Sequence, residues 1–152
     1  LGMLIEIVVC PTVRERDGLA MSSRNAYLKP PERKAATVLY RALQAAQAAF
    51  ARGERGGEAL RRAMLAVLAQ EPMAVLDYAA VADPETLAGV RQAGPCALAL
   101  LAVKIGKTRL IDNRGLSLID GPKAPPWRPL GSGTEPHRRA EGPSLASPGC
   151  GD

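Results

Sequence analysis

The loop Met21–Asn25 is the segment of this sequence whose residue types could do the most chemistry. Its letters, MSSRN, bring the hydroxyls of Ser22 and Ser23, the guanidinium of Arg24 and several backbone N–H groups into one short stretch. A polyphosphate needs this set, namely closely spaced donors and one fixed cation that grips two oxygens. Gly18, just upstream, would let the loop close over a ligand. The residues alone leave two interpretations open, a phosphate-binding loop and a solvated polar turn.

Composition excludes several other kinds of site. The chain has 152 residues, a net charge of +5 and a pI near 9.4, which suits one domain or a domain with a tail. The basicity is mild and spread out, so it does not indicate nucleic-acid binding. Cys10, Cys96 and Cys150 lie far apart and His137 is the single histidine, so we expect no metal site built from side chains. No apolar run reaches the ~18 residues of a membrane span and no leader is recognisable, so we expect a cytoplasmic protein.

The elements around the loop predict an α+β fold, two helices packed on a small antiparallel sheet. Apolar residues at helical spacing predict one helix over Glu32–Arg52, with Gly53 at its C-terminal end, and another over Glu58–Gln70. The predicted strands are Val75–Ala82, Pro95–Lys104 and Thr108–Asp112, with a helical turn over Glu85–Val90.

Single residues carry further predictions. Phe50 and Met64 are expected in the core, and Cys10 and Cys96 as buried thiols on apolar segments. Lys104 and Lys107 flank a turn and are expected on the surface. Asp112 and Asn113 are expected to cap the last strand. The charge run Arg14–Asp17 has two interpretations, a solvated loop and a brace for the loop that follows it.

The two ends of the sequence differ from the middle. Leu4–Val9 is a continuous apolar run typical of a strand in a parallel sheet, so we expect it to belong to a sheet whose other strands are not in this chain. Residues 114–152 hold 7 of the 13 prolines and 7 of the 15 glycines without hydrophobic periodicity. This composition predicts a disordered tail.

Several ordered motifs resemble one enzyme family. The chain resembles the pantothenate synthetase (pantoate–β-alanine ligase) family over roughly residues 5 to 113. The resemblance is carried by three segments in order, IEIVVCPTVRERDGLAMSSRNAYL, LDYAAVADPETL and LALLAVKIGKTRLIDN. The resemblance implies an AMP-forming ligase of the nucleotidyltransferase superfamily, with a Rossmann-like N-terminal domain and a smaller C-terminal lid domain. In that scheme residues 1–12 are a remnant of the Rossmann-like domain, 13–28 the ATP-binding loop, 29–113 the C-terminal α+β domain and 114–152 the tail.

The resemblance also implies an activity and a set of site residues. ATP with Mg²⁺ bound through its phosphates activates pantoate as an adenylate, and β-alanine then displaces AMP. Met21, Ser22, Ser23 and Arg24 match the ATP-contacting loop, with Ser22, Ser23 and Arg24 as its catalytic residues. Val13 matches the valine whose backbone contacts adenine. Arg14 and Glu15 also match the family, so a bracing role stays open beside the more common interpretation, a solvated loop.

Other family motifs are absent from the sequence. It has no PTMGALHxGH segment and no KDYQQ-type segment, and His137 in the tail cannot replace them. We therefore expect a C-terminal fragment that is inactive alone and meets pantoate and β-alanine only through a missing N-terminal domain. The family forms homodimers, largely through that domain. Two alternatives stay open: a non-enzymatic basic module that binds nucleotide or nucleic acid, and a fragment with no function.

The tail departs from the family after Asn113. Ile119–Pro122 faintly resembles the opening of cytidylate kinase, to which some cyanobacterial members are fused. The phosphate loop GxxxxGK[ST] of such a kinase is lacking. A plain low-complexity tail is the favoured interpretation.

Overall fold

The computed structural model describes residues 10–117. The predictions for Leu4–Val9, for Ile119–Pro122, for His137 and for the tail beyond residue 117 lie outside the described residues. Within them, the order of elements is η1 (Ser23–Tyr27), α1 (Pro30–Ala35), α2 (Val38–Ala51), α3 (Gly57–Leu68), β1 (Ala74–Ala82), β2 (Cys96–Ile105) and β3 (Thr108–Ser117). No helix of this part of the chain is long and apolar enough to cross a membrane.

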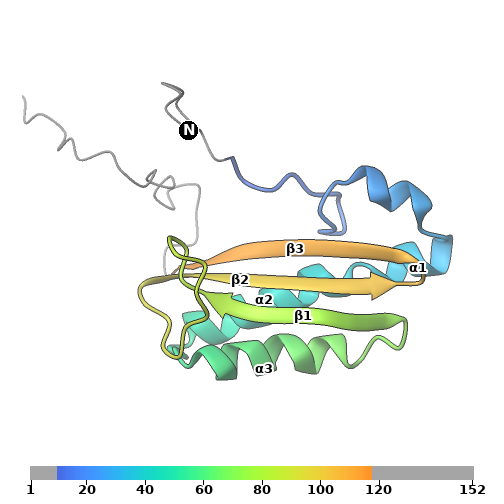
Figure 1. Cartoon of the computed structure of the whole chain (residues 1–152). Helices are drawn as coiled ribbons and strands as arrows, with labels where there is room; N and C mark the ends of the chain where they lie inside the picture. Colours follow the sequence, from blue (N-terminus) through green and yellow to red (C-terminus); the bar gives the residue numbers. More distant parts are fainter. Residues whose placement is uncertain (1–9, 118–152) are drawn as a thin grey trace, which may run out of the picture.

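The three strands form one antiparallel sheet in the order β1-β2-β3. Figure 1 shows α2 and α3 side by side on one face of this sheet, with the loop and η1 beyond the β3 edge. The helices bury Phe50, Leu60 and Met64 completely against strand residues such as Leu101. Each such side chain contributes about 1.5–3 kcal/mol by leaving water. The α+β prediction and the core positions of Phe50 and Met64 are confirmed.

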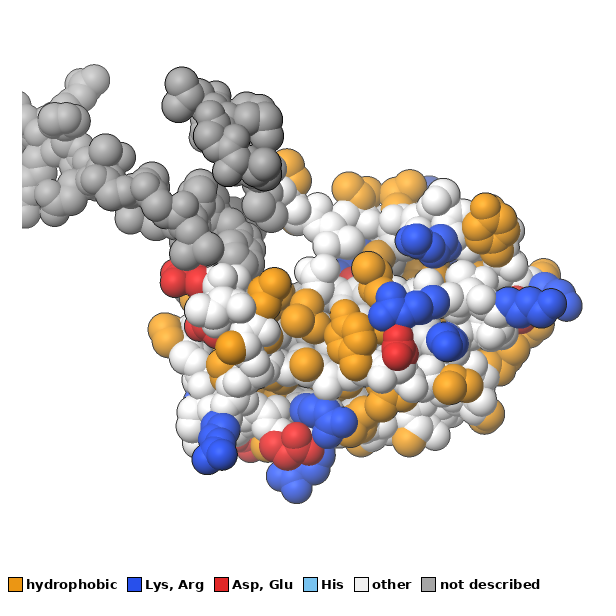
Figure 2. Space-filling model, viewed as in Figure 1, with side chains coloured by type: hydrophobic (Ala, Val, Ile, Leu, Met, Phe, Trp, Pro, Cys, Tyr) orange, Lys and Arg blue, Asp and Glu red, His pale blue; other side chains and the backbone are white. Residues whose placement is uncertain are grey.

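The opposite face of the sheet is open and carries apolar side chains. Val75, Tyr78 and Ile111 are 62%, 41% and 57% exposed. Figure 2 shows apolar side chains across this face, with charged side chains at one end of it. Two of these charges form a pair, since Arg109 Nε donates to Asp77 Oδ2 at 2.7 Å. Asp77 lies at the irregular step in the β1–β2 register.

The predicted helix over Glu32–Arg52 is divided into α1 and α2 at Ala36–Thr37. Thr37 Oγ1 donates to Lys34 O at 2.9 Å, and this local bond competes with the regular helical ladder. The C-terminal end of α2 agrees with prediction, because Gly53 has the left-handed φ of +98° that ends a helix.

Four other predictions need correction. Strand β3 runs to Ser117, five residues beyond the predicted end at Asp112, so the first four residues assigned to the tail are strand. They pair with the beginning of β2, and Leu116 is fully buried, which stabilises the extension. The predicted helical turn over Glu85–Val90 is an irregular loop, held at its start by Asp83, whose carboxylate accepts from Thr86 N at 2.9 Å.

The remaining two corrections concern single side chains. Cys10 and Cys96 are exposed thiols, because Cys10 lies in an extended segment and Cys96 is at the terminus of a strand. Asp112 does not cap a strand end, because β3 continues beyond it and its carboxylate is buried. Lys104 and Lys107 are exposed as predicted.

Candidate functional site

The predicted ligand loop begins in a tight hairpin. Arg14 and Ala20 form an isolated antiparallel bridge, Glu15 N donates to Leu19 O at 2.8 Å, and Met21 N donates to Val13 O at 3.0 Å. Val13 and Met21, which the resemblance assigns to adenine and to the ATP loop, are therefore direct neighbours. Both side chains are exposed, at 67% and 59%.

Gly18 makes the turn of this hairpin and lies against the core domain. Its φ of +90° is a backbone conformation that side chains disfavour. A Cβ built on Gly18 would overlap the Tyr40 ring on α2, so only glycine fits between the turn and the helix. The sequence predicts that Gly18 lets the loop close over a ligand. In the structure Gly18 is instead buried and packed against the domain.

Arg14 ties the hairpin to the sheet. Its Nη1 donates to Asp112 Oδ2 at 2.7 Å and its Nη2 donates to Asp112 Oδ1 at 3.0 Å, a two-pronged ion pair. Nη1 also donates to Gly18 O at 3.0 Å, and the guanidinium lies over the Tyr40 ring, 4.8 Å from its centre. Of the two interpretations of the charge run, the bracing one is confirmed for Arg14.

A second, exposed ion pair holds the same hairpin to α1. Arg33 Nη1 donates to Asp17 Oδ2 at 2.7 Å, and these side chains are 29% and 45% exposed. The hydrogen bond from Arg33 holds the pKa of Asp17 below its ordinary value, and the same bond raises the pKa of Arg33. The hairpin is thus fixed at two points, one buried and one at the surface.

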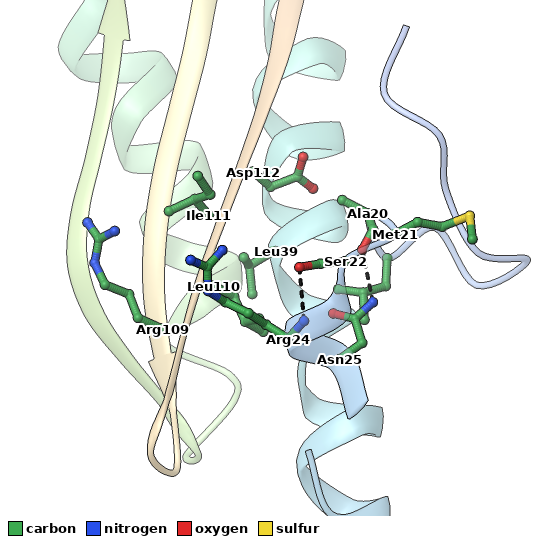
Figure 3. A pocket seen from close by; sticks show the side chains of 11 residues that line it. Ala20, Met21, Ser22, Arg24, Asn25, Leu39, Arg109, Leu110, Ile111 and Asp112 are labelled. Carbon is green, nitrogen blue, oxygen red and sulfur yellow. Dashed lines mark hydrogen bonds between the residues drawn. The ribbon is translucent and has the colours of Figure 1, made fainter. Parts of the chain in front are cut away.

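The residues after the hairpin form η1 and one wall of a cavity. Ser22 Oγ accepts from Arg24 N at 3.2 Å, and Asn25 Nδ2 donates to Ala20 O at 3.0 Å (Figure 3). Asn25 Oδ1 is buried and finds no donor in residues 10–117. The first bond caps η1, and the second joins η1 to the outgoing arm of the hairpin.

The cavity lies between this loop and β3 and has a volume of about 210 Å³. Its lining comprises Leu19, Ala20, Met21, Ser22, Arg24, Asn25, Leu39, Arg109, Leu110, Ile111 and Asp112. Among the predicted site residues, Met21, Ser22 and Arg24 therefore share the cavity. Val13 and Ser23 are exposed beside it and do not line it.

Among residues 10–117, the charges around the cavity leave the Arg24 side chain without a partner. Asp112 is neutralised by Arg14, and Arg109 by Asp77. The Arg24 side chain extends from η1 toward β3, is exposed, and forms no hydrogen bond or ion pair with another described residue (Figure 3). Ser22 uses its oxygen as an acceptor, so its hydroxyl hydrogen stays free to donate. A free guanidinium next to free hydroxyls favours an anionic ligand.

Side chains for a metal site are not grouped in the described residues. No cluster of three or more His, Cys, Asp or Glu residues occurs between residues 10 and 117.

Sequence reasoning did not identify the roles of three residues that shape this site. Asp112 and Tyr40 fix Arg14 and Gly18, and Asn25 fixes η1. A signal for Asp112 existed, because strand alternation places it on the same buried face as Leu110 and Leu116. A lone carboxylate on a buried face requires a cationic partner.

Comparison with known proteins gives one consistent result. The sequence model of a family described as Pantoate-beta-alanine ligase matches residues 1–115. The chain is 62% identical over 113 residues to a pantothenate synthetase of Roseiflexus sp. (strain RS-1), a match that covers 74% of this chain and 41% of that relative. It is 57% identical over 116 residues to the pantothenate synthetase of Herpetosiphon aurantiacus, a match that again covers 74% of this chain and 41% of that relative.

Solved structures agree with the sequence relatives. The crystal structure of a pantothenate synthetase from Thermus thermophilus superposes with a TM-score of 0.68 at 42% sequence identity. That match covers 71% of this chain and 39% of the Thermus chain. The chain thus spans about two fifths of the length of the relatives that it matches.

Proposed function

Because this chain belongs to the pantoate-beta-alanine ligase family, we propose that it supplies the ATP-phosphate-binding part of such a ligase. The reaction is the condensation of pantoate with β-alanine, driven by cleavage of ATP to AMP and diphosphate. The pantoate carboxylate attacks the α-phosphorus and diphosphate leaves. The β-alanine amine then attacks the acyl carbon and AMP leaves with the bonding electrons.

The observation that carries the proposal is the Arg24 guanidinium, which has no partner among residues 10–117, beside the Ser22 hydroxyl at the cavity and on an anchored loop. Ser22 and Ser23 donate hydrogen bonds to phosphate oxygens. Arg24 neutralises the charge that builds up on the departing diphosphate. In this proposal the backbone of Val13, whose carbonyl oxygen accepts from Met21 N at 3.0 Å, contacts the adenine.

The size of the cavity supports a partial site. Its 210 Å³ is below the roughly 300–1,000 Å³ of pockets that enclose a drug-sized ligand. The described residues therefore suit the phosphate end of the nucleotide, and the proposal assigns pantoate, β-alanine and the rest of ATP to the other part of the ligase. Mg²⁺ would be held through the ATP phosphates. In this arrangement the α+β domain acts as a lid, and the complete ligase is a homodimer.

A chimera tests the activity directly. The matched segment of the Roseiflexus sp. synthetase is replaced by the corresponding residues of this chain, and pantothenate and AMP are measured with ATP, pantoate and β-alanine. We expect both products. A folded chimera that forms neither product contradicts the proposal.

The role of the loop is tested in the same chimera by Arg24→Ala, with Arg62→Ala on the exposed surface of α3 as the matched control. Arg24→Ala should reduce pantoate-dependent ATP–diphosphate exchange by about 10²–10³-fold, as when one preorganised donor is removed. Arg62→Ala should leave the exchange rate unchanged. Equal exchange rates in the two variants would remove Arg24 from the adenylation step.

A further inference from the structure

The guanidinium of Arg14 joins the hairpin that leads into the loop Met21–Asn25 to strand β3. Its four hydrogen bonds reach two separate parts of the chain, since Gly18 O belongs to the hairpin while Asp112 Oδ1, Asp112 Oδ2 and Asn113 O belong to β3. Their donor–acceptor distances lie between 2.7 and 3.3 Å. A planar guanidinium that satisfies a carboxylate with both prongs has a fixed orientation as well as a fixed position.

The burial of Asp112 makes this contact obligatory. Its side chain is 2% exposed, whereas that of Arg14 is 18% exposed. A buried carboxylate must remain paired, so the fold holds Arg14 at this one point of β3. Asp112 Oδ1 also accepts from Asn113 N at 2.8 Å, a second bond that restricts the orientation of the carboxylate.

A short chain of contacts leads from Arg14 to the groups that would meet the ligand. The bridge with Ala20 connects the two arms of the hairpin, and Met21 follows directly in the outgoing arm. Ala20 O accepts from Asn25, which places η1 and therefore Ser22 and Arg24. The Tyr40 ring limits movement of the hairpin on the other side, where it contacts both Arg14 and Gly18.

We infer that Arg14 is a positioning residue of the ligase, which acts through Asp112 to set the direction in which Ser22 and Arg24 face the ATP phosphates. Arg14 itself does not line the cavity and touches no ligand in this scheme. The inference rests on the proposed function for the identity of the ligand. The order that Arg14 imposes on the loop is a property of the chain without any ligand. The positioning role of Arg14 and the proposed binding of ATP can therefore be tested, and can fail, separately.

The first measurement is hydrogen exchange of the backbone amides of residues 20–24 in the full chain without ligand. Arg14→Lys keeps the charge and loses the two-pronged geometry, and Asp112→Asn keeps the shape and loses the charge. Both variants should exchange these amides at least about tenfold faster, with the amides of α3 unchanged. Arg33→Lys, which alters the exposed pair on the same hairpin, is the matched control and should stay within about twofold.

The second measurement is the affinity of the same proteins for Mg·ATP, with rescue by added guanidinium. In Arg14→Ala, guanidinium ion at low millimolar concentration should restore slow exchange and ATP affinity by filling the vacated place beside Asp112. Methylammonium at equal ionic strength should not restore either. Rescue by guanidinium but not by methylammonium would show that the effect of the substitution arises at the place beside Asp112 and needs the planar, two-pronged donor rather than a positive charge alone.

The hydrogen-exchange and affinity measurements together distinguish the ordering role of Arg14 from the identity of the ligand. The inference is overturned if folded Arg14→Lys and Asp112→Asn chains exchange the backbone amide hydrogens of residues 20–24 at the wild-type rate. If Arg14→Ala does not fold, Arg14→Lys still provides this test. Faster exchange in these variants, together with an unaltered chain that does not bind Mg·ATP, supports the ordering role of Arg14 and counts against the proposed ligand. Faster exchange with ATP affinity reduced about tenfold or more supports both.

Discussion

Two neighbouring stretches of the same loop differ in how their side chains are used. In residues 14–18, the Arg14 and Asp17 side chains are committed to partners and Gly18 is packed against Tyr40. In Met21–Arg24, the side chains are exposed, and the Arg24 guanidinium forms no bond with another described residue. A ligand can use only groups that the fold has not already satisfied. The first stretch therefore fixes the loop, and the second is available for chemistry.

This contrast predicts that substitutions in the first stretch damage the fold, whereas those in the second damage ligand binding alone. The largest effect is expected from Arg14→Ala. It leaves the Asp112 carboxylate buried without a cation, which costs about 3–5 kcal/mol of the free energy of unfolding. Urea denaturation followed by circular dichroism measures this loss.

A double variant provides the control for that prediction. Arg14→Met combined with Asp112→Leu removes both charges and keeps similar volumes, so it should recover most of the lost stability. If the double variant is as unstable as Arg14→Ala, the packing of the Arg14 side chain outweighs the buried charge.

Arg24→Ala should show the opposite behaviour. Its effect on the free energy of unfolding should stay within about 0.5 kcal/mol, because the guanidinium is exposed and has no partner in the described residues. Its effect on the adenylation step should be about 3–4 kcal/mol if it faces the transferring phosphates. A loss of stability as large as that of Arg14→Ala would remove the contrast between the two stretches.

Gly18→Ala is expected to cost about 2–4 kcal/mol, because backbone strain and overlap with the Tyr40 ring add to each other. The matched control is Gly53→Ala. Gly53 has a similar φ of +98° but has open space around the added methyl group, so only the strain of about 1 kcal/mol should appear. Equal losses of thermal stability in the two variants would show that the Tyr40 contact is unimportant.

Among the substitutions that remove a contact, the smallest effect on the free energy of unfolding is expected from loss of the exposed ion pair between Arg33 and Asp17. Arg33→Ala should cost about 0.2–1 kcal/mol at neutral pH, since both side chains are partly exposed and screened. The pKa of Asp17 is lowered by Arg33, so this stabilisation is present above the ordinary carboxyl pKa of about 3.9 and disappears as pH falls through the lower pKa of the folded state. The difference between the wild type and Arg33→Ala should therefore be constant above about pH 5 and vanish well below pH 4. A difference that grows on acidification would contradict this assignment.

Much of the fold followed from local patterns. Helical spacing identified α3 and the core positions of Phe50 and Met64, and β1 and β2 began and ended within one residue of prediction. The end of β3 could not be predicted, because Arg114 and Gly115 have a composition typical of a loop and become strand only by pairing with β2. The first helix is interrupted at Thr37, where the side chain forms a local hydrogen bond to Lys34 O that helical spacing does not reveal.

The candidate site was predictable in part. The residue types of Met21–Arg24 and their likeness to one family identified the groups that would meet phosphate, and the comparisons confirm the family. The partner of Arg14 could not be identified in this way, because Asp112 lies 98 positions further along the chain. The prediction that the thiols of Cys10 and Cys96 are buried was wrong for a related reason. Apolar neighbours in the sequence do not bury a residue that lies at or beyond the end of a helix or strand.

The sequence by itself determined the family, the presence of helices packed on a three-stranded sheet, and which side chains have the chemistry to bind an anion, because these depend on residue type, short spacing and motif order. Only the tertiary structure decided which of the charged residues are already neutralised. Asp112 is paired with Arg14, Arg109 is paired with Asp77, and Arg24 has no partner in the described residues. Coulomb pairing depends on distance in space and on burial, and both are set when distant segments pack together.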